Sequence, residues 1–314
     1  MQEKKYLYID KKQRVPIDGK LPRRVTRILE EFQKASHQAD FCYLDQIEIN
    51  LNSGEIQILA NGHDIKEYSH ILLGGHVTTT QYELKQFMID YTENLVCDSR
   101  PVVQNAKALK KLPYYNKLYM AKFFIDNSIP HMKGYYTGGN LHLPLAIDYP
   151  LIAKSYDGTN RIQQIGNKEV VKKDIYKITS DQEWSDDRLI KARIADYFIQ
   201  EFSDAGEDFR LFVSKSQFIG GWKRKAATSE FLTVGKNSVY TYYNSPSQEM
   251  KNLAEDVAKK LEADFVAVDI INKDNKPYIL EISLNPGFHA YENKCQNGEP
   301  ANIAKAIIES FPED

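Results

Sequence analysis

The chain has 314 residues, of which 42% are hydrophobic and 27% are charged, and its formal net charge at pH 7 is −2. This composition is typical of a globular protein with room for two or three lobes, and it excludes a disordered chain. The small net charge gives no overall field that would attract nucleic acid or an anionic membrane, so we expect neither as a partner.

The sequence also indicates where the protein works. No apolar run approaches the length that spans a membrane, and no secretory signal is visible. The three cysteines, Cys42, Cys97 and Cys295, are far apart and odd in number, which is typical of a reducing compartment. We therefore expect a cytoplasmic protein, and the sequence leaves open whether it forms a homo-oligomer.

The first hundred residues alternate between expected strands and helices. A strand at 6–9 is followed by an amphipathic helix that begins at Pro22. A short buried strand at 71–73 precedes a helix at 82–91. This alternation predicts an α/β lobe with a parallel sheet over residues 1–100.

After about Asn105 the pattern changes to helices and antiparallel hairpins. Strands are expected at 150–154 and 197–202, with further hairpins towards the C-terminus. We expect a central lobe over residues 101–196 and a C-terminal lobe over residues 197–314.

The last two expected strands carry the most informative residues. An apolar strand at 265–271 is interrupted only by Asp269, and the strand at 277–282 carries Glu281. If the three residues 274–276 close a hairpin, Asp269 faces Glu281 at about 5 Å. Carboxylates so close on apolar strands repel unless a cation or a shared proton relieves them, and the pair suits Mg²⁺. The alternative is a pair that faces solvent at a strand end.

Two lysines are candidates for binding phosphate. Lys154 ends an apolar strand beside a loop that contains Gly158, where it can reach phosphate oxygens. Lys117 lies in the expected first turn of a helix capped by Asn116, where backbone N–H groups and the helix dipole favour an anion. For each lysine the alternative is a side chain that reaches water.

Further charged residues are expected to gather in the C-terminal lobe. Asp208 and Arg210 share one face of a strand, and the next strand ends in residues 222–225, which include three cations. As an isolated run, such charges more often form a solvated edge. The segment 200–202 follows an apolar strand and resembles an extended hinge that exposes backbone groups.

Taken in order, these features resemble the ATP-grasp superfamily, and within it the RimK-type carboxylate–amine ligases, which include the ribosomal-protein glutamate ligases. The likeness runs from about Ile71 to Ile308. The motifs that carry it are 105–130 with Lys117, 150–154, Gly158-Thr159, Gln200-Glu201-Phe202, Gly206 to Arg210, Lys223-Arg224, Val268-Asp269 and Glu281 to Glu292.

The resemblance implies an α/β (α+β) ATP-grasp fold in which an N-terminal α/β lobe precedes two antiparallel-sheet lobes that clamp ATP. It implies an ATP- and Mg²⁺-dependent, ADP-forming ligase. In that reaction a carboxylate attacks the γ-phosphate to give an acyl phosphate, which an amine captures as an amide. The implied partners are ATP, a carboxylate substrate and an amine from an amino acid, peptide or protein.

The resemblance also implies roles for residues that match by position. The nucleotide would contact Lys117, Lys154, Gly158, Thr159, Gln200, Glu201, Phe202 and Asp208, while Arg210 and Arg224 would steady the transferring phosphoryl or the acyl phosphate. The metal ligands would be Asp269, Glu281 and Asn285.

Three departures from the family pattern stand out. Ser283 occupies the position where the family usually has a metal-binding asparagine, which leaves Ser283 and Asn285 as alternatives for a third ligand. Arg161 and Gln163 stand where further glycines are usual, and the segment 226–235 carries no acceptor signature.

These departures keep two alternatives open beside the amide-forming ligase. One is a peptide-modifying ligase that closes side-chain lactones or lactams. The other is a catalytically silent ATP-binding module, as in the synapsins.

Overall fold

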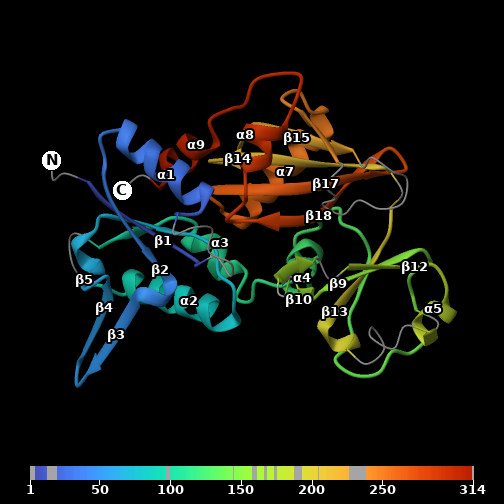
Figure 1. Ribbon diagram of the computed structural model, residues 1–314, viewed down its shortest axis with the longest axis horizontal. Helices are drawn as coiled ribbons and strands as arrows, with labels where there is room; N and C mark the ends of the chain where they lie inside the picture. Colours follow the sequence, from blue (N-terminus) through green and yellow to red (C-terminus); the bar gives the residue numbers. More distant parts are fainter. Residues whose placement is uncertain are drawn as a thin grey trace.

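The structure is a computed structural model that describes residues 4–12, 20–96, 100–143, 145–157, 161–165, 168–172, 175–186, 193–203, 205–225 and 238–312. Three lobes follow one another along the chain, from the blue N-terminal lobe through the green and yellow central lobe to the orange and red C-terminal lobe (Figure 1). No helix in these residues is long and apolar enough to cross a membrane.

The N-terminal lobe is built on a parallel sheet, as the sequence predicts. Its strands, in the order β2-β1-β6-β7, are β2 (Gln38–Tyr43), β1 (Lys5–Asp10), β6 (His70–Leu73) and β7 (Val102–Val103). The lobe's helices are α1 (Arg23–Lys34), α2 (Thr79–Glu93) and α3 (Ala106–Lys111), and a second sheet contains β3 (Ile47–Asn52), β4 (Glu55–Ala60) and β5 (His63–Asp64).

The central lobe is an antiparallel sheet, as expected. Its strands, in the order β12-β9-β13-β8, are β12 (Ile175–Ile178), β9 (Leu151–Ser155), β13 (Tyr197–Glu201) and β8 (Gly134–Tyr135). Beside it lie the hairpin of β10 (Arg161–Ile165) and β11 (Lys168–Lys172), and the helices α4 (Lys117–Asp126) and α5 (Asp181–Asp186).

The C-terminal lobe is a second antiparallel sheet. Its strands, in the order β16-β15-β14-β17-β18, are β16 (Val239–Tyr242), β15 (Gln217–Lys225), β14 (Glu207–Ser214), β17 (Phe265–Lys273) and β18 (Lys276–Ser283). Its helices are α7 (Gln248–Leu261), α8 (His289–Lys294) and α9 (Ile303–Glu309), and α9 lies beside α1 of the N-terminal lobe (Figure 1).

The expected lobe boundaries remain predictions. At each of them, a strand that follows the boundary pairs with a strand that precedes it. β7 follows residue 100 but pairs with β6 of the N-terminal sheet. β13 begins at Tyr197 but pairs with β9 in the central sheet. Each expected boundary therefore separates a strand from the sheet to which it belongs. The three lobes nevertheless follow one another in the expected order.

The two faces of the C-terminal sheet differ in what covers them. On one face Leu211 of β14 packs with Val257 of α7 in a common hydrophobic core. On the other face Phe212 belongs to a core that includes Ile28 of α1 and Ile307 of α9. Because neighbouring strand residues point to opposite faces, the side chains of Arg210 and Phe212 share the second face.

The hairpin of β17 and β18 differs from expectation at its turn. The loop contains two residues, Asp274 and Asn275, both with positive φ, and Lys273 pairs with Lys276. Such a two-residue turn shifts the register by one position relative to the predicted three-residue loop. A β-bulge between Asp269 and Ile270 shifts it back, so that Asp269 pairs with Glu281 as predicted.

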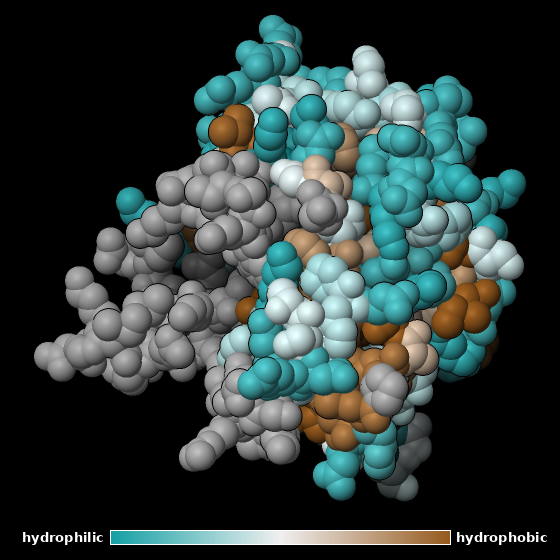
Figure 2. Space-filling model, turned by 90° about the vertical axis from the view of Figure 1, so that its right-hand side faces the viewer, coloured by the Kyte–Doolittle hydropathy of each residue, from teal (hydrophilic) through white to brown (hydrophobic). Residues whose placement is uncertain are grey.

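Figure 2 shows the end of the molecule that lies at the right of Figure 1. This face is mainly hydrophilic, and hydrophobic residues gather low on it, at the level of the central lobe.

Candidate active site

A row of charged side chains crosses the C-terminal sheet. These side chains lie on the same face of the sheet as Phe212. Arg210 of β14 pairs in register with Asp269 of β17, which pairs with Glu281 of β18. Arg210 donates from Nε and Nη2 to the two carboxylate oxygens of Asp269, at 2.7 and 2.8 Å. This bidentate ion pair is a strong form of charge-assisted hydrogen bonding, and it fixes the orientation of both side chains.

Arg210 also holds the segment that follows β18. Its Nη1 lies 3.3 Å from the carbonyl oxygen of Gly287, to which it donates. Burial lowers the pKa of Arg210, but Asp269 and Glu281 outweigh that effect, so its pKa is raised and the guanidinium stays charged. A permanent cation is therefore positioned beside both carboxylates.

Lys117 closes the other end of the row. Asn116 caps α4 by accepting a hydrogen bond from the Tyr119 N–H at 3.0 Å, as the sequence predicts. The Nζ of Lys117, in the first turn of that helix, lies 3.6 Å from Oε1 of Glu281. Cations thus relieve both carboxylates, which is one of the two outcomes that the sequence left open.

A second ion pair joins β14 to its other neighbour, β15. Arg224 of β15 pairs in register with Asp208 of β14 and donates from Nε and Nη2 to its two oxygens, with Nε at 2.8 Å. Burial raises the pKa of the Asp208 carboxyl, while the bonds from Arg224 act against that rise. The structure therefore brings Asp208, Arg210, Arg224 and Asp269 together at one end of the sheet.

The two alternatives for a third metal ligand lie differently. The Oδ1 of Asn285 is buried and accepts no hydrogen bond from the described residues, while its Nδ2 lies 2.8 Å from where a Cβ on Gly75 would be. Ser283 is two positions from Glu281 on β18. Burial raises the pKa of the Tyr115 phenol, and a hydrogen bond with the Ser283 side chain lowers it in part.

The donor set fits a hard cation with few protein ligands. Two carboxylates on adjacent strands, and a buried amide oxygen that has no partner among the described residues, are oxygen donors of the kind that Mg²⁺ accepts. Within the part of the chain that the structure describes, no three or more His, Cys, Asp or Glu side chains are grouped to hold a metal ion. An ion at this place would therefore depend on ligands from a bound phosphate as well.

Lys154 and Gln200 lie on one face of the central sheet. Lys154 on β9 donates from Nζ to Oε1 of Gln200 on β13 at 2.7 Å. Leu151 and Ile199, on the opposite face of these strands, belong to the central hydrophobic core. The lysine therefore lies on the face of the sheet that the core leaves available.

The segment 200–202 forms the link between these two lobes. The N–H of Glu201 donates to Lys133 at 2.9 Å, and the N–H of Phe202 donates to Pro150 at 3.1 Å. Lys273 of β17 forms an ion pair with the Glu201 carboxylate. A ligand read through these two N–H groups has to compete with existing hydrogen bonds.

Some predicted site residues lie outside the described part of the chain. These are Gly158 and Thr159, and with them the segment 226–235. The side chains of Arg161 and Gln163 are not described either.

The N-terminal lobe adds residues that the sequence reasoning missed. Asp10 ends β1 and accepts hydrogen bonds from Arg24 at 2.9 Å and from the Gly75 N–H at 2.7 Å. Arg24 also donates to the carbonyl oxygen of Pro286 at 3.2 Å. Two signals in the sequence could have revealed them: an aspartate at the end of a buried strand, and the pair Gly74-Gly75 after β6. Both lie at the carboxyl ends of parallel strands, where ligands bind in open α/β sheets.

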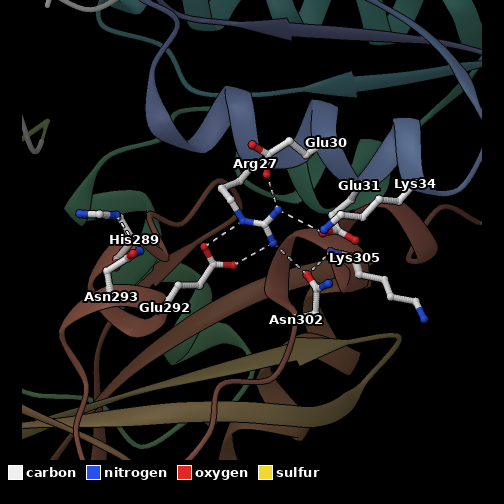
Figure 3. A network of polar contacts seen from close by, with 9 residues as sticks. All are labelled: Arg27, Glu30, Glu31, Lys34, His289, Glu292, Asn293, Asn302 and Lys305. Carbon is white, nitrogen blue, oxygen red and sulfur yellow. Dashed lines mark hydrogen bonds and ion pairs between the residues drawn. The ribbon is translucent and has the colours of Figure 1, made fainter.

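A larger network holds this lobe against the C-terminal lobe. Figure 3 shows Arg27 of α1 surrounded by acidic and amide side chains from both lobes. It donates to Glu30 at 2.8 Å, Glu31 at 3.1 Å and Glu292 of α8 at 3.3 Å, and it also contacts Asn302. Because these bonds position α8, they also position the segment between β18 and α8, which carries Asn285.

The fold is similar to that of solved structures. The ATP-grasp ligase PsnB, solved with a phosphomimetic variant of its minimal precursor, Mg and ADP, is 15% identical with a TM-score of 0.66, over 98% of this chain and 99% of that chain. The RimK domain protein from Sphaerobacter thermophilus is also 15% identical, with a TM-score of 0.60 over 98% and 99%. The fold is therefore that of the ATP-grasp proteins.

The sequence comparison names the family. The model of the RimK-like ATP-grasp domain matches residues 143–311, which is more than half of the chain. The chain belongs to the RimK-like ATP-grasp family. A probable alpha-L-glutamate ligase from Saccharophagus degradans is 27% identical over 118 residues, and the match covers 37% of this chain and 39% of that protein.

Proposed function

We propose that the protein is an ADP-forming ligase that uses ATP to join a carboxylate to an amine as an amide. The observation that carries the proposal is the row of alternating charges Arg210, Asp269, Glu281 and Lys117. Two cations and two carboxylates there neutralise each other across three strands and a helix. Such a set can exchange its internal partners for phosphate and a metal ion without leaving a charge unpaired.

The residues have distinct tasks in this proposal. Asp269 and Glu281, with Asn285 as a further candidate, would hold Mg²⁺, which when bound neutralises phosphate charge. Lys117 and Lys154 bind the phosphates of ATP, with Gly158 and Thr159 of the adjoining loop as further contacts. Segment 200–202 lies along the adenosine, and Asp208 keeps Arg224 in position.

The chemistry follows from that arrangement. An oxygen of the substrate carboxylate attacks the γ-phosphorus of ATP, ADP leaves, and an acyl phosphate forms. Arg210 and Arg224 stabilise the charge on the transferring phosphoryl group. The amine nitrogen then attacks the acyl carbon, phosphate leaves, and the nitrogen loses a proton to give the amide.

The comparisons favour a second candidate, a ligase that modifies peptides. Solved ATP-grasp ligases with bound precursor peptides, such as PsnB and the macrocyclase MdnC from Microcystis aeruginosa, match nearly the whole chain in fold. The alignment with the Saccharophagus protein spans 39% of that relative. A peptide substrate that supplies both the carboxylate and the nucleophile would give a lactone or a lactam.

Hydroxylamine trapping tests the proposal. The full chain is incubated with ATP, Mg²⁺, hydroxylamine and a panel of amino acids and peptides that carry carboxylates. We expect a hydroxamate and ADP in equal amounts with at least one carboxylate, because hydroxylamine captures the acyl phosphate. A peptide product lighter by one water, formed without hydroxylamine, identifies the ring-forming reaction.

The controls separate the remaining outcomes. Arg210→Ala should lower hydroxamate formation by about 10²–10³-fold, whereas Arg193→Ala, which breaks the exposed pair with Asp196, should leave it unchanged. Binding of ATP without ADP release for every carboxylate would overturn the ligase and leave the silent module.

A further inference from the structure

A cavity of about 410 Å³ lies between the N-terminal lobe, the start of α4 and the end of β9. Its walls are mainly aromatic, with the rings of His76, Tyr82, Tyr114, Tyr115, Tyr119 and Tyr156 among them. A cavity of this size whose walls combine aromatic rings with polar groups, such as Thr78, Asn116 and Asp157, is typical of a small-ligand site.

The aromatic walls are held by contacts with one another and with the backbone. The ring centroids of Tyr114 and Tyr119 are 4.8 Å apart, and those of His76 and Tyr82 are 4.9 Å apart. The hydroxyl of Tyr82 donates to Leu112, and that of Tyr115 donates to Ile282 at 3.0 Å. Since these two hydroxyls are engaged by the backbone, the walls offer ring surface in a fixed arrangement.

The charge on the cavity's described lining is negative, although the nearby Lys85 and Lys11 act on His76 more strongly than Asp157 does. Among the described residues that line it there is one carboxylate, that of Asp157, and there is no lysine or arginine. Burial, with Lys85 and Lys11, lowers the pKa of His76 to about 3, so its ring is neutral at pH 7. Neither lysine lines the cavity, and the Nζ of Lys85 is engaged by the Gly74 carbonyl oxygen at 2.7 Å.

The cavity borders the row of charges described above. Asn116 lines it, and the next residue, Lys117, pairs with Glu281. The N–H of Lys117 donates to the carbonyl oxygen of Tyr156 at 3.1 Å, which joins two walls of the cavity. A molecule that places one end in the cavity therefore has its other end beside the proposed phosphoryl-transfer site.

We propose that this cavity binds the cationic side chain of a basic substrate, a guanidinium or ammonium group on an amino acid or peptide. Aromatic faces attract such cations through their quadrupole, and the Asp157 carboxylate adds a charge of the opposite sign. The role of this site as a substrate site rests on the proposed ligase function. The affinity for the cation does not.

Two probes of the same shape test the charge preference directly. N-acetyl-L-argininamide and N-acetyl-L-citrullinamide are titrated into the full chain without nucleotide, and binding is followed by calorimetry or by ligand NMR. We expect the arginine probe to bind about tenfold more tightly, because the two differ essentially in charge. Equal binding, or tighter binding of N-acetyl-L-phenylalaninamide, would overturn the assignment.

Matched variants locate the preference in the cavity. Asp157→Asn and Tyr119→Leu should each reduce the preference for the arginine probe, whereas Tyr119→Phe, which keeps the ring, should retain it. Asp148→Asn and Tyr43→Leu remove the same groups outside the cavity and should change nothing. A preference that survives both cavity variants, with their circular dichroism unchanged, would place the cation elsewhere.

The outcome separates from that of the ligase proposal because the titration contains no ATP. Selective binding of the arginine probe by a chain that never forms hydroxamate would support the cavity and refute the ligase. Hydroxamate formation by a chain without any preference would refute the cavity alone.

Discussion

Two ends of one sheet face differ in the kind of residue that they carry. On β14, Arg210 and Phe212 point to the same face, and on β17 the same holds for Asp269 and Ala267. At one end Phe212 lies in a closed core with Tyr291 of α8, their ring centroids 5.3 Å apart. At the other end Arg210 lies in a two-pronged ion pair with Asp269.

The difference shows which part of this sheet face packs into a hydrophobic core and which part is available to bind a ligand. Apolar side chains are stabilised by removal from water alone, whereas a buried charge is tolerated only with a partner in good geometry. Replacing a buried ion pair with apolar groups is often neutral or stabilising. The ion pair at the charged end is therefore better explained by ligand binding than by folding.

The apolar end should give the largest effect on stability. Phe212→Ala removes a buried ring, and we expect a loss of about 3–5 kcal/mol in the free energy of unfolding. The affinity for ATP in the folded fraction should change little, because the ring lies on the core side of Arg210. Urea unfolding and calorimetric titration measure the two quantities. A large loss of affinity at unchanged stability would contradict the division into two ends.

The charged end should respond in the opposite way. Arg210→Leu together with Asp269→Leu makes this end resemble the other one, and we expect stability close to that of the original chain. Asp269→Leu alone should be less stable than this double variant, since it leaves Arg210 without its carboxylate. Hydroxamate formation should fall by about 10²–10³-fold or more in both variants.

Unfolding curves and trapping assays on the four members of this double-mutant cycle check that expectation. Activity retained by the double variant would remove both residues from the proposed mechanism. A double variant less stable than either single one would show that the pair contributes mainly to folding.

The sequence predicted correctly which residues of the hairpin pair at the charged end, but it did not predict the turn and the bulge that produce this pairing. Alternation put Asp208 and Arg210 on one face, and the expected three-residue loop predicted that Asp269 pairs with Glu281. The turn at Asp274 and Asn275 was wrong by one residue, and a bulge corrected the register. Bulges depend on how a strand must bend in the complete sheet, which local sequence does not specify.

The ion-pair partners could not be predicted in the same way. That Arg210 binds Asp269 and that Lys117 binds Glu281 depends on how β14 and α4 lie against the hairpin, at sequence separations of 59 and more than 100 residues. The cavity is a stronger case, because Tyr82, Tyr115 and Tyr156 come from separate parts of the chain. Only the cap at Asn116 was visible locally, because an N-cap is a short-range signal.

The central lobe offers a smaller test of the same division between site and core. Lys154→Met keeps the aliphatic part of the side chain but removes the cation that now binds Gln200. We expect ATP to bind about tenfold more weakly or worse, because bonds to a charged phosphate contribute more than neutral ones. Calorimetric titration measures the affinity, and Lys122→Met on the exposed surface of α4 is the control. Unchanged affinity in a folded Lys154→Met variant would return this lysine to the solvent-facing alternative.

The smallest effect concerns His76, which lines the aromatic cavity and is held without a charge. Its pKa is lowered from 6.5 to about 3, chiefly by burial and then by Lys85 and Lys11. Between pH 6.5 and 3 the unfolded chain therefore binds a proton that the folded chain does not, so this contribution to stability is complete above pH 6.5 and is lost as the pH falls through that window. Between pH 7 and pH 5 the loss is on the order of 1–2 kcal/mol.

His76→Asn should lose less stability than the original chain over this interval in urea unfolding, whereas His142→Asn, at an exposed position, should lose as much. An NMR signal of His76 that titrates near pH 6.5 would show that the ring becomes charged in the folded protein. It would remove the basis for a cavity in which Asp157 carries the only charge among the described lining residues.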